Sequence, residues 1–121
     1  MTGWWEADDV QPWLLVSAAG RPVAYGELWL DPDEDEVELA RIIVAPEARG
    51  RGIGHRMVDE LTVAAAGTGL RRLFLRVDPE NTVAIRCYRA AGFVDVHPDV
   101  SAQWNREQPV GYLWMCRPEN R

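Results

Sequence analysis

The chain has 121 residues and a mass of 13.7 kDa, the length of one domain with one hydrophobic core. Hydrophobic residues make up 47% and charged residues 26%, which excludes a disordered chain and a disulfide scaffold. The net charge is −6, from 19 acidic and 13 basic residues, which argues against binding to nucleic acid.

Membrane and metal sites are also disfavoured. No apolar run approaches the ~20 residues of a membrane span, and the first residues do not resemble a signal peptide, so we expect a cytoplasmic protein. Cys87 and Cys116 fit no metal-ligand spacing, so we expect two reduced thiols and no bound metal.

Three extended segments are predicted first along the chain. Residues 13–16 and 23–30 are apolar runs on either side of a Gly-Arg-Pro turn, which predicts a β-hairpin. The acidic segment 31–36 leads into a third strand over residues 37–45. Simple alternation along that strand predicts two faces. One face would carry Val37, Leu39, Arg41, Ile43 and Ala45, and the other Glu38, Ala40, Ile42 and Val44.

The rest of the chain alternates helices and strands. Apolar residues recur at helical spacing from Ile53 to Ala65, and Gly67 is a stop signal, which predicts a helix. The further elements expected are a strand over 73–77, a helix around 84–91 ended by Gly92, and strands over 93–96 and 112–116 joined by a polar loop containing Trp104. This order predicts a single α/β domain over residues 1–121 with a mixed sheet.

The strongest local signal lies between the third strand and the first helix. Residues 49–54 read Arg-Gly-Arg-Gly-Ile-Gly, and glycines allow the backbone to turn sharply and direct its N–H groups to one point. The positive end of the following helix dipole adds to that field. The loop is therefore suited to a phosphate or pyrophosphate, although the Gly-Lys-Ser/Thr of a P-loop is absent from it.

Two motifs resemble those of the GCN5-related N-acetyltransferase (GNAT) superfamily. Arg49, Gly52 and Gly54 form an Arg-x-x-Gly-x-Gly pattern that resembles its acetyl-CoA-binding signature. Residues 81–93 are similar to its Asn-x-x-Ala-x-x-x-Tyr-x-x-x-Gly-Phe segment at every named position. The resemblance covers residues 13–116. It implies a GNAT-like α/β fold, with a mixed, mostly antiparallel sheet and helices on both faces, shortened at its N-terminal end.

The resemblance also implies a site for acetyl-CoA. The backbone groups of Ile42 and Val44 would pair with the acetyl and pantetheine amides, and loop N–H groups would hold the pyrophosphate. Asn81 is similar to the residue that helps to fix the pantetheine, and Tyr88 to the one that donates a proton near the CoA sulfur. The loop residues concerned are Arg49, Gly50, Arg51, Gly52, Ile53, Gly54 and His55.

The reaction implied is transfer of an acetyl group from acetyl-CoA to a primary amine of a small molecule or protein, by direct attack. Most of such an amine is protonated at pH 7, so a base helps. Glu38 matches the position at which histone-acetylating members carry their general base; Glu36 and a water relay are the alternatives. A non-catalytic acyl-CoA-binding regulatory module, or a subunit of a larger acyltransferase, is the alternative function.

The short N-terminal part and the acidic segment lead to two expectations about partners. Apolar surface around Trp4, Trp5 and Trp13 predicts a contact with a second copy, and hence a homodimer. The acidic residues within 31–38 favour a cationic acceptor such as a polyamine or basic peptide. Trp29 and Trp104 are candidates for lining the acceptor pocket.

Overall fold

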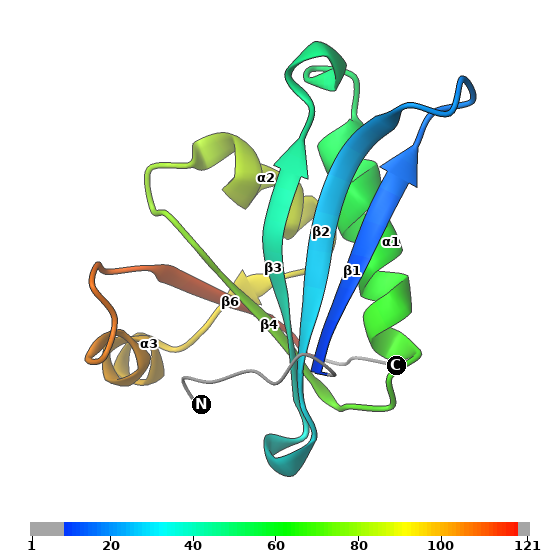
Figure 1. The fold of residues 1–121 in the computed structure, drawn as a ribbon. Helices are drawn as coiled ribbons and strands as arrows, with labels where there is room; N and C mark the ends of the chain where they lie inside the picture. Colours follow the sequence, from blue (N-terminus) through cyan, green and yellow to red (C-terminus); the bar gives the residue numbers. More distant parts are fainter. Residues whose placement is uncertain (1–8, 119–121) are drawn as a thin grey trace.

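A computed structural model describes residues 9–118, which form a six-stranded sheet and three α-helices. The strands follow the order β1-β2-β3-β4-β6-β5, and among these pairs only β3 and β4 run parallel (Figure 1). The strands are β1 (Val10–Val16), β2 (Pro22–Asp31), β3 (Glu36–Val44), β4 (Arg72–Val77), β5 (Val94–Asp95) and β6 (Leu113–Arg117). The helices are α1 (Ile53–Ala66), α2 (Thr82–Ala90) and α3 (Pro98–Asn105). The mixed, mostly antiparallel sheet expected from the sequence is confirmed.

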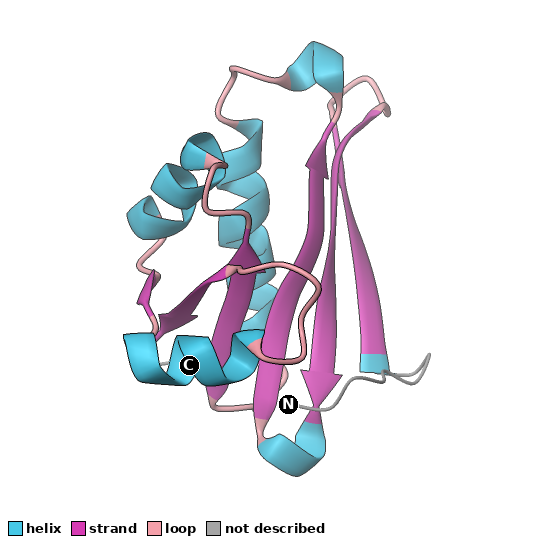
Figure 2. Cartoon of the chain, turned by 90° about the vertical axis from the view of Figure 1, so that its left-hand side faces the viewer, coloured by secondary structure: helices cyan, strands magenta, loops and turns pink. Residues whose placement is uncertain are grey.

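Helices α1 and α2 cover one face of the sheet and form the core with it (Figure 2). Leu61 of α1 and Leu28 of β2 are fully buried there, and burial of such a side chain contributes about 1.5–3 kcal/mol. Gly26 of β2 lets α1 approach closely, because a Cβ at this position would lie 2.6 Å from Leu61 Cδ1.

Helix α3 corrects the expectation of a polar loop before the last strand. Its Trp104 ring lies 5.6 Å from the Phe74 ring and 5.1 Å from the Trp114 ring. Phe74 alternates along β4 with residues that face α1, so α3 covers part of the opposite face of the sheet, called here the second face. Pro98 at the first helical turn was a start signal, but the helix is short and has no buried side chain to give it a clear period.

The alternation predicted for β3 is wrong beyond Ala40, because the strand contains a β-bulge. Tyr25 pairs with Ile43 but Glu27 pairs with Ala40, so two residues of β3 lie opposite Gly26. Arg41, at the bulge, has a left-handed backbone with φ of 53°. Because of the extra residue, each side chain after the bulge points to the face of the sheet opposite to the one that simple alternation predicts. The side of β3 that packs on the core carries Val37, Leu39, Ile42 and Val44.

Strands β3 and β4 separate halfway along their length. Their paired residues are Glu36–Leu39 and Arg72–Leu75. Beyond these pairs β3 continues to Val44 and β4 to Val77 without a further rung between them, and Figure 1 shows the two strands diverging. The separation begins immediately before the bulge. The bulge and the end of the β3–β4 pairing together interrupt the sheet between its two central strands.

Candidate functional site

A cavity of about 810 Å³ lies beside the part of β3 that has left β4. It is bounded by the end of β3, the glycine-rich loop, the first turn of α1 and one side of α2. It brings together two motifs that lie about 30 residues apart in the sequence. The residues singled out from the sequence that line it are Ile42, Val44, Arg49, Gly50, Gly52, Ile53, Gly54, His55, Asn81 and Tyr88. Arg51 and Glu38 are not among the lining residues.

The glycine-rich loop presents backbone donors to this cavity. Gly50 and Gly52 have φ angles of 78° and 75°, which glycine adopts without strain. Gly52 caps α1, and its carbonyl accepts the first helical hydrogen bond from Arg56 N–H at 3.1 Å. The N–H groups between Gly52 and Arg56 therefore precede the helical ladder. They lie at the positive end of the helix dipole and are suited to bind an anion.

Two arginines flank the loop. The Arg49 Nε donates to the Val44 carbonyl at 3.3 Å, which holds this side chain at the rim of the cavity. Arg51 is exposed, and its guanidinium adds positive charge near the same loop without lining the cavity.

Helix α2 supplies the opposite wall. The Asn81 side chain accepts from Ala84 N–H at 3.2 Å and caps the helix while it lines the cavity. Tyr88 is 9% exposed and packs edge-on against Phe93, with 6.2 Å between ring centroids. Burial, with a smaller effect from Cys87, raises the pKa of Tyr88 to about 12. Its hydroxyl is therefore protonated at neutral pH and can act as a hydrogen-bond donor.

A cysteine and a histidine meet across the cavity. Cys87 Sγ lies 3.8 Å from His55 Nδ1, and His55 Nε2 lies 3.5 Å from an Asp59 carboxylate oxygen. Burial raises the pKa of the Cys87 thiol, and the Asp59 charge raises it further. Cys87 is therefore a thiol, not a thiolate, at neutral pH.

Glu38 lies on the second face of the sheet and is 1% exposed. Its two carboxylate oxygens accept from Arg76 Nε at 2.8 Å and from Arg76 Nη2 at 3.2 Å. Burial raises the pKa of Glu38, and the Arg76 guanidinium opposes that effect. The residue expected to be a general base is thus enclosed and paired with a cation.

Arg76 is itself held by several neighbours. Its Nη1 donates to Gln108 Oε1 at 2.9 Å. Its guanidinium lies over three aromatic rings, at 5.1 Å from the Trp114 centroid, 5.7 Å from Tyr112 and 5.9 Å from Trp29. Trp29 therefore lies on the second face of the sheet. Trp104 lies on the same face, where it belongs to α3 and packs against Phe74 and Trp114.

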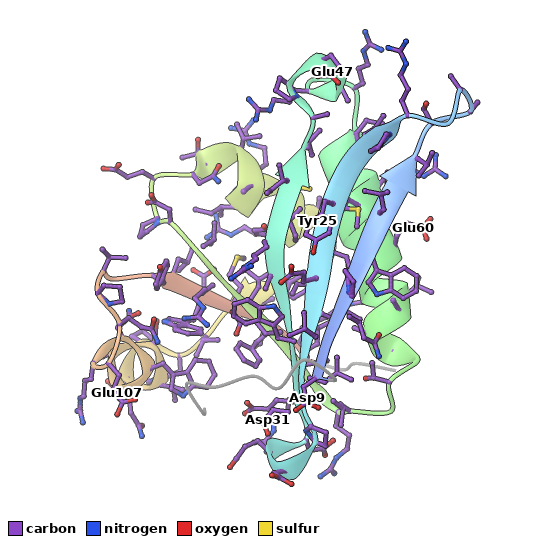
Figure 3. All side chains as sticks on the ribbon, viewed as in Figure 1. Asp9, Tyr25, Asp31, Glu47, Glu60 and Glu107 are labelled. Atoms are coloured by element: carbon purple, nitrogen blue, oxygen red, sulfur yellow. The ribbon has the colours of Figure 1, made fainter. Side chains whose placement is uncertain are left out.

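A second carboxylate on this face, Glu27, was missed by the sequence analysis. Its oxygens accept from Tyr25 Oη at 2.5 Å and from Trp29 Nε1 at 2.7 Å, and Arg41 Nε lies 3.8 Å away. These hydrogen bonds and Arg41 lower the pKa of Glu27, although burial is the largest single effect and acts in the opposite direction. Figure 3 shows Tyr25 on β2, in front of the sheet and away from α1. Residue spacing along β2 places Tyr25, Glu27 and Trp29 on one face and was the available signal.

The acidic segment lies far from the cavity. Asp31 and Glu47 mark opposite ends of the sheet in Figure 3, and the loop that lines the cavity follows Glu47. Arg71 donates to both oxygens of Asp35, through its backbone N–H at 2.9 Å and its Nε at 2.5 Å. Glu36, the reserve candidate for the base, is 9% exposed and has one oxygen, Oε2, without a hydrogen-bond partner. Neither end of this segment borders the cavity.

Two negative findings concern the described residues alone. Within residues 9–118, no helix is long and apolar enough to cross a membrane, and no cluster of three His, Cys, Asp or Glu residues could hold a metal ion. Trp4 and Trp5, expected to form an exposed patch with Trp13, lie outside the described residues; Trp13 is 44% exposed on β1.

Comparison with known proteins finds a family model and a relative that are similar to this chain. The model of the acetyltransferase (GNAT) family matches residues 1–93. A mycothiol acetyltransferase of Jonesia denitrificans is 32% identical over 110 residues, which cover 91% of this chain but 34% of that protein. The chain thus spans about a third of the length of this relative.

Solved structures are similar in fold. The ribosomal-protein-S18-alanine N-acetyltransferase of Escherichia coli has a TM-score of 0.73 at 20% identity, over 96% of this chain and 73% of that one. A spermidine N-acetyltransferase of Vibrio cholerae, in complex with CoA and spermine, has a TM-score of 0.68 at 23% identity, over 74% of this chain and 54% of that one. At these identities the likeness is one of fold alone.

Proposed function

The chain belongs to the acetyltransferase (GNAT) family, and we propose that it is an acetyl-CoA-dependent N-acetyltransferase. It moves an acetyl group to a primary amine of a small molecule or protein by direct attack of the amine. The single observation that carries this proposal is the cavity, which joins the loop at Gly52 to the helix that bears Asn81 and Tyr88.

The donor would lie along the unpaired part of β3. The pyrophosphate fits the N–H groups between Gly52 and Arg56, with Arg49 at the rim. The apolar lining from Ile42 and Val44 suits the pantetheine arm, and the free edge of β3 offers backbone groups for its amides. Arg51 would contribute to pyrophosphate binding through its positive charge.

The acceptor would approach from the second face, through the opening between β3 and β4. When bound, the donor supplies a thioester carbonyl: the amine nitrogen forms the new C–N bond, the C–S bond breaks, and the nitrogen loses a proton. This direction of approach places Trp29 and Tyr112 beside the acceptor. It also leaves the leaving sulfur on the side of Tyr88.

Tyr88 would stabilise the leaving thiolate. Burial raises the pKa of Tyr88 to about 12, whereas an ordinary thiol has a pKa of about 8.5. Complete proton transfer from the phenol to the thiolate is therefore unfavourable by roughly three to four pK units. We expect a hydrogen bond from the Tyr88 hydroxyl to the sulfur, with the proton coming finally from solvent.

The alternative is a protein that holds acyl-CoA without turnover, alone or as part of a larger acyltransferase. The two functions differ in one assay, release of free thiol from acetyl-CoA in the presence of a panel of primary amines. Thiol release that depends on both the amine and the protein supports the enzyme. Saturable binding of acetyl-CoA with no release above the protein-free rate, across the whole panel, supports the binding module.

We also propose a homodimer in the cytoplasm. Trp13, Leu14 and Val16 expose 44%, 54% and 49% of their surface on β1, at the edge of the sheet, and a second copy would cover them. Light scattering at micromolar concentration tests the dimer, and a monomeric mass would overturn it. A cationic acceptor stays part of the proposal, although Asp35 of the acidic segment is paired with Arg71.

A further inference from the structure

The cavity has an arginine on each of its two walls. Arg49 lies on the loop side, where its Nε donates to the Val44 carbonyl. Arg86 lies on α2, on the opposite wall, and its side chain is exposed. The residues that line the cavity, all within the described part of the chain, include no Asp or Glu, although the whole chain has a net charge of −6. The cavity is therefore cationic at two separate places.

Arg86 belongs to a different stripe of α2 from Tyr88. Ala84 and Tyr88 lie four residues apart and form an inner stripe, which packs on the core. The outer stripe consists of residues three and four positions apart that also line the cavity and are exposed or half-buried. These are Val83, Arg86, Cys87 and Ala90. The inner stripe thus borders the buried part of the cavity, and the outer stripe borders its rim.

A contact with α1 shows which end of the cavity the outer stripe borders. Cys87, the residue after Arg86, has its Sγ 3.8 Å from His55 Nδ1. His55 belongs to the first turn of α1, whose N–H groups precede the helical ladder and are suited to bind an anion. The outer stripe therefore borders the end of the cavity at which the glycine-rich loop presents its backbone donors.

We infer that Arg86 binds the 3′-phosphate of CoA and thereby makes the protein select CoA over dephospho-CoA. This inference rests on the proposed function and names a further binding residue of the same site. In CoA the pyrophosphate lies between the pantetheine arm and the adenosine, whose ribose carries the 3′-phosphate. With the pyrophosphate at the loop and the pantetheine along β3, the adenosine end would extend towards the exposed rim, where Arg86 lies.

The 3′-phosphate is the part of CoA that a second cation would bind best. A phosphate monoester carries a charge of about −1.5 to −2 at neutral pH. The loop N–H groups and Arg49 are directed at the pyrophosphate, whereas a guanidinium on the other wall can donate two hydrogen bonds to a second phosphate group. Because Arg86 is exposed, water screens this interaction, and its effect is a preference for CoA rather than a strict requirement.

Calorimetric titration of CoA and of dephospho-CoA tests the inference without turnover, because the two ligands differ by this phosphate alone. We expect the wild type to bind CoA about tenfold more tightly than dephospho-CoA, as one charge-assisted contact typically provides. In Arg86→Gln the Kd for CoA should rise by about tenfold, while the Kd for dephospho-CoA stays within about twofold of the wild type. Arg86→Lys keeps the charge but loses the fork, so it should retain part of the preference.

Arg89→Gln is the matched control. Arg89 lies one turn further along α2 and carries the same charge, but it pairs with Asp95 and does not line the cavity. Arg86 and Arg89 are both exposed, so both variants should fold, which circular dichroism checks. We expect Arg89→Gln to keep the full preference for CoA.

Three results would overturn the inference and leave the proposed function standing. The first is equal affinity of the wild type for CoA and dephospho-CoA. The second is a preference for CoA that persists in Arg86→Gln, or that Arg89→Gln loses to the same extent. The third is an equal rise of both Kd values in Arg86→Gln, which would place Arg86 at the pyrophosphate. If the wild type binds neither CoA nor dephospho-CoA, the proposed function and this inference fail together.

Discussion

Glu38 and Arg76 lie 38 residues apart in the sequence and form a two-pronged ion pair on the second face of the sheet, with nitrogen–oxygen distances of 2.8 and 3.2 Å. The carboxylate is 1% exposed, and the arginine side chain is 20% exposed. The pair joins β3 to β4 near the last rung before the strands separate. It therefore ties the two strands together close to the point where they separate.

Replacing one member of this ion pair is expected to lower the free energy of unfolding more than replacing both members. Arg76→Met leaves a buried carboxylate unpaired, so we expect a loss of about 3–5 kcal/mol in the free energy of unfolding, measured with urea. Replacing both residues, Glu38→Leu with Arg76→Met, should cost much less than the sum of the two single changes. Arg89→Met, which removes an exposed pair with Asp95, is the control and should change stability by less than about 1 kcal/mol. Additive single costs would show that the pair is not coupled.

Replacement of the buried Glu36 carboxylate by an uncharged group is expected to stabilise the protein. Burial raises the pKa of Glu36, although the Arg72 charge partly opposes this, so the folded state binds the proton more tightly than the unfolded state. The ionised form thus costs stability at neutral pH, and that cost disappears as the pH falls through the raised pKa. Glu36→Gln should therefore raise the melting temperature at pH 7, and by less at pH 4.5. A lower melting temperature at pH 7 would contradict this explanation.

Asp35 provides a control for Glu36, because its pKa is shifted in the opposite direction. Its hydrogen bonds with Arg71 lower the pKa of Asp35, so its contribution to stability is present above the unfolded pKa of about 3.8 and is lost as the pH falls further. Asp35→Asn keeps a side chain suited to the local φ of 57°. We expect it to lower the melting temperature at pH 7, and by less at pH 3. Calorimetry of both variants should therefore show a higher melting temperature for Glu36→Gln and a lower one for Asp35→Asn at pH 7.

The sequence predicted the strands, two of the helices and the glycine-rich loop, because each depends on neighbouring residues. Glycine at positions 50 and 52 indicates a left-handed backbone, and the structure has φ angles of 78° and 75° there. The family resemblance added the second wall of the cavity at Asn81 and Tyr88. All these positions belong to short motifs, so the spacing of the residues within each motif can be recognised in a single sequence.

The parts that were missed depend on contacts between distant segments. The bulge at Arg41 shifts the register by one residue, and nothing in the apolar pattern of 37–45 indicates where the shift occurs. The partner of Glu38 could not be identified from the sequence, because Arg76 belongs to another strand. The structure adds that the carboxylate of Glu38, the first candidate for the general base, is half of an ion pair.

Tyr88→Phe tests the donor role of the tyrosine. Removal of one hydrogen bond to a developing anion typically lowers kcat by about 10²–10³-fold, and we expect a loss at the lower end of that range. Calorimetry should find the affinity for acetyl-CoA within twofold of the wild type, because the ring and its contact with Phe93 remain. The pKa of about 12 also predicts that ionisation of Tyr88 does not affect kcat below about pH 10.5. Unchanged kcat would make Tyr88 a core aromatic residue only.

The central claim, that the loop at Gly52 binds the pyrophosphate of acetyl-CoA, is tested most directly by calorimetric titration of acetyl-CoA into two matched variants. Gly52 and Gly69 have φ angles of 75° and 77°, and a Cβ at either would meet nothing within 4 Å, but only Gly52 lines the cavity. Gly52→Asp and Gly69→Asp therefore introduce the same strain and charge at two different places. We predict that Gly52→Asp raises the Kd by at least tenfold, about 1.4 kcal/mol, while Gly69→Asp leaves it within twofold of the wild type. Equal Kd values for the wild type and both variants would contradict the assignment of the site.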